Sequence, residues 1–88
     1  MAWYQINVAN ERHATEITDL EKEVLRLRAM DSRFRLYATR DFYQQSGGDH
    51  TYYLRIPDAH QESVKSILDK HAGQACDEPD PRTIRLLL

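Results

Sequence analysis

Hydrophobic residues in this chain change their spacing along the sequence, and this change limits the folds that the chain can form. Tyr4, Ile6 and Val8 recur at every second position, as in a strand with one buried face. From Asn10, which we expect to cap a helix, to about Met30 the spacing becomes three and four residues, which is typical of an amphipathic helix. The first third of the sequence therefore predicts a strand followed by a helix.

The middle of the chain returns to a period of two. Residues 33–39 and 51–56 each alternate between apolar and polar side chains, which predicts two further strands. Gly47 and Gly48 stand between them and permit the positive φ angles of a hairpin turn. We therefore expect these two strands to pair as an antiparallel hairpin.

The last third repeats the change of spacing. Pro57 ends the strand before it, and apolar residues at helical spacing predict a second helix from Asp58 to about Gly73. A final strand is expected over residues 83–88. The order strand, helix, strand, strand, helix, strand predicts an α+β, ferredoxin-like βαββαβ two-layer sandwich. In this fold a four-stranded antiparallel sheet carries both helices on one face. We expect residues 1–88 to form a single domain of this kind.

Size and charge exclude several classes of function. An 88-residue chain can bury one core between two layers but not a deep cleft between two lobes, which disfavours a large-substrate enzyme. Twelve Lys and Arg against fourteen Asp and Glu give a net charge of −2, so the chain lacks a global basic field for nucleic acid. The sequence has one cysteine and no apolar run of membrane-spanning length, so we expect a cytoplasmic protein with no membrane association.

Catalytic and metal-binding patterns are not found in the sequence. The four histidines are spaced so that no two share a metal-ligand motif, and each is expected to be an isolated surface residue. Cys76 is expected to be an unreactive thiol, because neighbouring carboxylates raise a thiol pKa. We therefore expect a non-enzymatic protein with no cofactor and no metal site.

One set of residues does suggest a binding surface. If the helices cover the most apolar face of the sheet, the alternation places aromatic and arginine side chains together on the other face, without an acidic residue. Tryptophan, tyrosine and arginine are the residues enriched at the energetic centres of protein interfaces. The predicted partner-binding residues are Trp3, Arg33, Arg35, Tyr37, Tyr53, Arg55 and Arg85.

Three interpretations of this face remain open. It is an ordinary exposed sheet surface, a docking surface for another protein or for a second copy of the chain, or a platform for single-stranded RNA. We favour a protein partner, and expect an inhibitor or adaptor of a larger protein, a class that includes phage- or mobile-element-encoded inhibitors of bacterial defence systems. The alternative partner surface is acidic and lies on the first helix. Its residues are Glu11, Glu16, Asp19 and Glu23.

The RNA interpretation also has a structural parallel. The order of elements, with Trp3 on the first strand and Tyr53 on the third, resembles the RNA recognition motif. The resemblance implies a sheet face on which bases stack. Residues 50–56 (HTYYLRI) lack the Lys/Arg-Gly-aromatic-Gly/Ala-aromatic pattern of that family, and we do not assign the chain to it.

Overall fold

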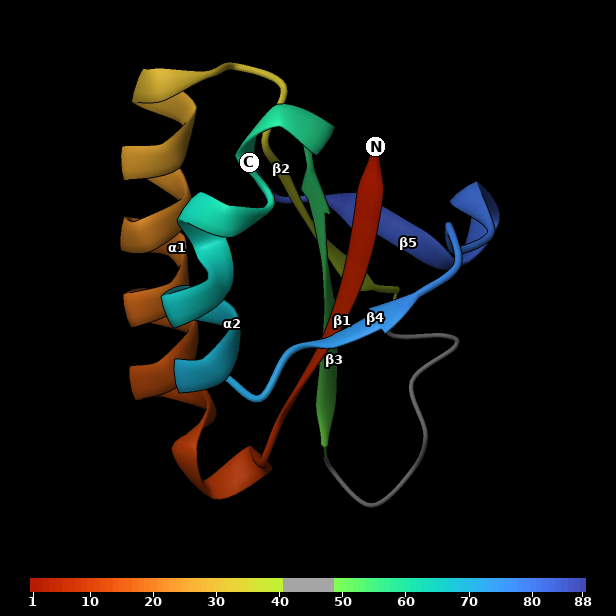
Figure 1. Cartoon of the computed structure of the whole chain (residues 1–88). Helices are drawn as coiled ribbons and strands as arrows, with labels where there is room; N and C mark the ends of the chain where they lie inside the picture. Colours follow the sequence, from red (N-terminus) through yellow and green to blue (C-terminus); the bar gives the residue numbers. More distant parts are fainter. Residues whose placement is uncertain (41–48) are drawn as a thin grey trace.

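The computed structural model describes residues 1–40 and 49–88, which form an α+β domain with two helices packed on one face of an antiparallel sheet (Figure 1). The strands are β1 (Ala2–Val8), β2 (Arg35–Thr39), β3 (His50–Ile56), β4 (Gln74–Cys76) and β5 (Ile84–Leu86). The helices are α1 (His13–Met30) and α2 (Lys65–Lys70), with 3-10 turns η1 (Asn10–Arg12), η3 (Asp58–His60), η4 (Glu62–Val64) and η5 (Pro81–Thr83). The turn predicted at Gly47 and Gly48 lies outside the described residues.

The described sheet has five strands in the order β4-β1-β3-β2-β5, so the prediction of four strands is wrong. The strand that the sequence did not reveal is β4, which pairs antiparallel with the outer edge of β1. The last strand, β5, pairs instead with β2 at the other edge of the sheet. Each neighbouring pair of strands is antiparallel.

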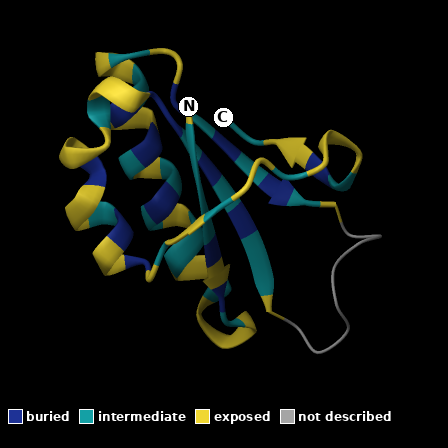
Figure 2. Cartoon of the chain, turned by 45° about the vertical axis from the view of Figure 1, so that its right-hand side comes forward, coloured by how far each residue is buried: buried dark blue, intermediate teal, exposed yellow. Residues whose placement is uncertain are grey.

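The core lies between the sheet and the helices, as the hydrophobic spacing predicts. Leu20 and Val24 of α1 and Leu36 and Leu54 of the sheet are fully buried. Figure 2 shows buried residues both on the helices and along the central strands. Ile67 of α2 is only partly buried, and Leu68 takes the inner position in this helix. The stripe of apolar residues on α1 therefore identifies the buried face correctly.

The second helix is much shorter than predicted. Two 3-10 turns occupy residues 58–64, and α2 itself has six residues. An isolated helix of this length is unstable in water, so α2 depends on the packing of Val64 and Leu68 against the core. Asn10 also differs from its predicted capping role, because its Oδ1 lies 3.1 Å from Nε2 of His50 and no side-chain cap is formed. Neither α1 nor α2 is both long and apolar enough to cross a lipid bilayer.

The link from β4 to β5 crosses the full width of the sheet. Glu78, Pro79 and Pro81 of this link line a pocket together with Trp3 and Tyr37, which lie on the face away from the helices. The link therefore runs over the second face of the sheet, on the side opposite α1 and α2 (Figure 1). We call residues 77–83 the crossing segment. The sequence predicted an uncovered second face, and the crossing segment covers part of it.

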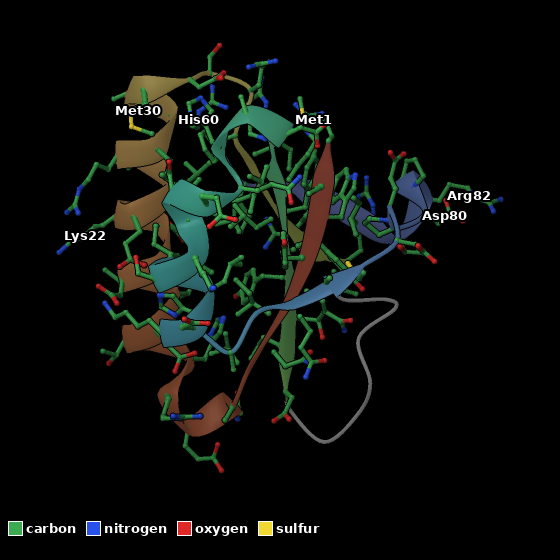
Figure 3. All side chains as sticks on the ribbon, viewed as in Figure 1. Met1, Lys22, Met30, His60, Asp80 and Arg82 are labelled. Carbon is green, nitrogen blue, oxygen red and sulfur yellow. The ribbon has the colours of Figure 1, made fainter. Side chains whose placement is uncertain are left out.

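Two residues hold the end of the crossing segment. Asp80 accepts hydrogen bonds from the backbone N–H of Arg82 at 3.0 Å and from its guanidinium Nη2 at 2.8 Å (Figure 3). These bonds lower the pKa of Asp80 and form the first turn of η5. The crossing segment therefore turns into β5 at a defined position.

Helix α2 is followed, two residues after its end, by an alanine in a conformation that favours glycine. Ala72 has a φ of 54°, while the N–H of Gly73 donates to the carbonyl of Leu68 at 2.7 Å. A side chain on Gly73 would lie 2.8 Å from Cδ2 of the buried Leu68, so glycine is needed here for close approach. The predicted C-terminal glycine is thus present, but the left-handed residue is the one before it.

We expect Ala72→Gly to stabilise the protein by about 0.5 to 1 kcal/mol. The left-handed conformation costs a non-glycine residue about 1–2 kcal/mol, and the greater freedom of glycine in the unfolded chain offsets part of the gain. Chemical denaturation measures the change, and Ala75→Gly in β4 is the control, which should destabilise. Equal loss of stability in both variants would show that the α2 terminus is built differently.

Candidate functional site

The face of the sheet opposite the helices carries most of the predicted aromatic and arginine side chains. Trp3 of β1 lies opposite Arg55 of β3, which in turn lies opposite Arg35 of β2. In the next row Tyr53 lies opposite Tyr37. Residues directly opposite each other on neighbouring strands point to the same face, so these five side chains form one surface, as the alternation predicts. We call this surface the open face.

Arg85 does not share the open face, and its predicted placement there is wrong. It lies opposite Ala38, whose side chain is buried beneath the helices. Burial raises the pKa of the Tyr52 phenol, and the positive charge of Arg85 lies close enough to oppose part of that rise. The register of β5 instead places Ile84 and Leu86 on the open face, because Leu86 lies opposite Tyr37.

Arg33 forms an ion pair with Asp31, two residues before it in the chain. Its Nη2 lies 2.7 Å from Oδ2 of Asp31, and its Nε donates to both oxygens of that carboxylate. The two-pronged pairing holds the pKa of Asp31 well below its usual range and raises that of Arg33. The guanidinium of Arg33 is therefore already paired, whereas no carboxylate of the described residues lies within ion-pair distance of Arg35 or Arg55.

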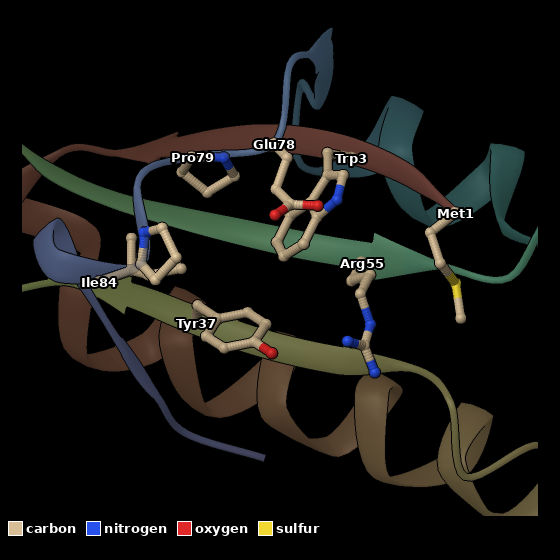
Figure 4. Close-up of a pocket in the computed structure, with 8 residues that line it drawn as sticks. Met1, Trp3, Tyr37, Arg55, Glu78, Pro79 and Ile84 are labelled. Carbon is tan, nitrogen blue, oxygen red and sulfur yellow. The ribbon is translucent and has the colours of Figure 1, made fainter.

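A pocket lies where the crossing segment passes over the open face. Its walls include the rings of Trp3 and Tyr37, with centroids 5.5 Å apart and planes inclined by 39°, together with Arg55. Glu78 and Pro79 close it from the crossing segment (Figure 4). The cavity holds about 240 Å³. The strands contribute no acidic side chain to this face, as the alternation predicts, but Glu78 reaches the pocket from a link that the alternation of the strands does not describe.

Exposed apolar side chains border the same pocket. Met1 lines it, and Leu86 lies beside Tyr37 with 53% of its surface exposed. Cys76 lies opposite Trp3 on the other side, where burial and then Asp77 raise the pKa of its thiol. These surroundings disfavour the thiolate form of Cys76.

A second cluster joins the two helices. Nε2 of His71 lies 2.8 Å from Oε2 of Glu23, and Nζ of Lys70 lies 2.6 Å from Oδ2 of Asp19 and 3.3 Å from Oε1 of Glu23. His71 is 4% exposed, so its prediction as a surface residue is wrong. The hydrogen bond between Lys70 and Asp19 raises the pKa of the ammonium and lowers that of the carboxyl. The pairing therefore stabilises the folded protein fully at pH values above the usual pKa of Asp and below the usual pKa of Lys. This stabilisation is lost as the pH falls through the lowered pKa of Asp19 or rises through the raised pKa of Lys70.

The helix cluster is also the arrangement in the described residues that could accept a metal. Asp19, Glu23 and His71 each offer a ligand atom, and these atoms lie within 4.8 Å of one another. The ammonium of Lys70 already lies against both carboxylates and supplies a positive charge there. The geometry therefore indicates that these side chains join α1 to α2, and we call Asp19, Glu23, Lys70 and His71 the helix clasp. The sequence could not reveal it, because Glu23 and His71 are 48 positions apart.

Two further histidines contact each other, contrary to the prediction that each is isolated. His13 of α1 stacks on His50 of β3 with ring centroids 3.6 Å apart, and its Nε2 forms a short hydrogen bond with the hydroxyl of Tyr52. Burial and then the nearby His50 lower the pKa of His13. Both effects disfavour the charged form of His13.

The acidic alternative surface is largely neutralised. Asp19 and Glu23 belong to the helix clasp, and Oε1 of Glu16 lies 3.7 Å from Nη1 of Arg12. Glu11, in η1, remains exposed. Three of the four predicted acids are thus paired within the chain, so this surface is a weaker candidate than the open face.

No protein-family model, curated protein or solved structure matches this chain. The candidate site therefore rests on its geometry and chemistry alone.

We expect Glu23→Ala to destabilise the protein by about 1–3 kcal/mol. The change removes the hydrogen-bond partner of a buried nitrogen of His71. The expected loss is the free-energy cost of leaving a buried polar group without a hydrogen bond. Chemical denaturation measures it against Glu62→Ala, at an exposed position, which should change stability by less than about 0.5 kcal/mol. Equal effects of the two changes would contradict the clasp.

Proposed function

We propose that this chain is a small non-enzymatic binding module that docks onto another protein through its open face, as an inhibitor or adaptor. The observation that carries the proposal is the pocket of Trp3, Tyr37 and Arg55, bordered by the exposed side chain of Leu86. Aromatic and arginine residues in a partly enclosed site are the typical anchors of protein interfaces. A second copy of the chain is one form that the partner can take.

The fold that carries Trp3, Tyr37 and Arg55 supports a docking function. We infer that β1, α1, β2, β3, α2 and β4 form a ferredoxin-like unit, to which the crossing segment and β5 are added. The strand order β4-β1-β3-β2 and the two helices on one face are consistent with that arrangement. Strands fix the side chains of Trp3, Tyr37 and Arg55 on a rigid surface, so little conformational entropy is lost when they bind.

Single-stranded RNA is the alternative, and the open face is less suited to it. Of the four arginines predicted to lie on this face, Arg33 is paired with Asp31 and Arg85 lies on the helix side. Glu78 also lines the pocket beside Trp3 and Tyr37, and its negative charge would repel the phosphates of a strand stacked there. With only Arg35 and Arg55 available, log K for RNA should fall with log salt at a slope of about −1.4.

Leu86 and Leu25 provide a matched test of the docking surface. Both are leucines with nearly equal exposure, 53% and 54%, and they lie on the open face and on α1 respectively. We expect Leu86→Gln to weaken partner capture at least about tenfold, roughly 1.4 kcal/mol, and Leu25→Gln to leave it unchanged. The measurement is pull-down from cells of the source organism with quantitative mass spectrometry, beside sedimentation of the pure protein to detect self-association.

Three outcomes would reject the proposal. Loss of capture with Leu25→Gln alone would place the interface on the helices. Recovery of RNA rather than protein, with a salt slope steeper than about −1, would favour the nucleic-acid alternative. Equal capture by both variants, with no self-association that Leu86→Gln weakens, would show that the open face does not bind a protein.

A further inference from the structure

Arg35 and Arg55 are directly opposite each other on neighbouring strands of the open face. Like charges at such positions repel and destabilise a sheet. No carboxylate of the described residues forms an ion pair with either guanidinium, whereas Arg33 and Arg82 are each paired with one. The open face therefore contains a concentration of positive charge that the chain leaves without a counter-charge.

The hydrogen bonding of Arg55 is also incomplete. One of its Nη atoms donates to the carbonyl of Arg33 at 3.3 Å, which turns the guanidinium along the sheet. Its Nε is buried and has no hydrogen-bond partner among residues 1–40 and 49–88. Buried N–H groups are nearly always bonded, and those that are not require an explanation such as an absent ligand. Because Nε is enclosed and Nη2 beside it already donates to Arg33, a ligand in the pocket can reach only the Nη end of the guanidinium, and the two Nη groups together can grip a planar carboxylate as a fork.

The surroundings of Arg55 indicate the kind of molecule that carries the missing anion. Trp3 and Tyr37 flank the pocket with apolar ring surface, and Pro79 adds an apolar wall from the crossing segment (Figure 4). Glu78 lies at the same pocket and would repel a ligand with many negative charges. A single carboxylate next to an apolar side chain fits these conditions, whereas a polyphosphate chain does not.

We propose that the pocket recognises a carboxylate side chain in an acidic, partly apolar peptide segment of the protein partner. Arg55 receives the carboxylate through the Nη end of its guanidinium, and Arg35 adds charge beside it. Trp3 and Tyr37 hold the neighbouring apolar residue of the peptide. This assignment rests on the proposed function and specifies the chemistry of the partner.

The protein contains a single tryptophan, and it lines this pocket, so its fluorescence reports occupancy directly. The probes are N-acetyl-Leu-Glu-Leu-amide and the same peptide with glutamine in place of glutamate. We expect the glutamate peptide to bind at least about tenfold more tightly, about 1.4 kcal/mol. Equal affinities of the two peptides would overturn the proposal.

Variants separate recognition by the fork from simple attraction. Arg55→Gln should abolish the preference for glutamate, and Arg55→Lys should lose most of it, because lysine keeps the charge without the planar fork. Arg26→Gln, at an exposed position of α1, should keep the full preference. Arg55→Gln should melt no lower than the wild type, since it removes a like-charge pair; a large loss of melting temperature would make Arg55 structural and reject the proposal. Arg35→Gln is the second variant and should reduce the preference about two- to threefold.

The results also distinguish this inference from the proposed function. Leu86-dependent capture of a protein without a preference for the glutamate peptide refutes the carboxylate site alone. A preference for glutamate without any Leu86-dependent capture or self-association refutes the docking function alone. Quenching of Trp3 by oligouridylate at lower concentrations than by the glutamate peptide would replace the peptide with RNA as the ligand.

Discussion

The structure depends on the fact that its last two strands lie at opposite edges of one sheet. Four spacings of about 4.8 Å separate β4 from β5, so the chain must advance about 19 Å between them. An extended chain needs about six residues for that distance, and the crossing segment has only residues 77–83, three of which form η5. The segment therefore runs nearly straight over the sheet, and Pro79 and Pro81 favour such an extended path.

Chain handedness determines which face the crossing segment covers. The strand β4 runs opposite to β1, and its connection proceeds across the sheet in the same direction as the β1-α1-β2 connection. The strands β4 and β5 are parallel to each other but run opposite to β1 and β2. A connection from β4 to β5 therefore has the same handedness as the β1-α1-β2 connection only if it passes over the face of the sheet opposite α1. The strong preference for right-handed crossovers thus directs residues 77–83 away from the helices. The pocket against Trp3 and Arg55 is a consequence of this path.

The sequence predicts those parts of the molecule whose pattern is local and long. The helix α1, the strands β1 to β3 and the core positions Leu20, Val24, Leu36 and Leu54 follow directly from hydrophobic spacing. The strand β4 has three residues without alternation, and it forms because the edge of β1 requires a partner. Its existence is therefore a tertiary effect.

The candidate site was only partly predictable for related reasons. The open-face placement of Trp3 and Arg55 follows from alternation, but the register of β5 does not. Residues 83–88 (TIRLLL) have apolar side chains at both odd and even positions, so either face could have been the buried one. Pairing with β2 decides the matter and moves Arg85 to the helix side. Glu78 reaches the pocket only through the crossing segment, which no spacing rule describes.

Nuclear Overhauser effects measured on the labelled protein test the crossing most directly. The account predicts contacts between the indole protons of Trp3 and the ring protons of Pro79, and cross-strand contacts between Tyr37 and Leu86. In a four-stranded arrangement the last strand would pair with β1, and Leu86 would show contacts to that strand in place of Tyr37. Such contacts, with no signal between Trp3 and Pro79, would contradict the crossing and with it the pocket.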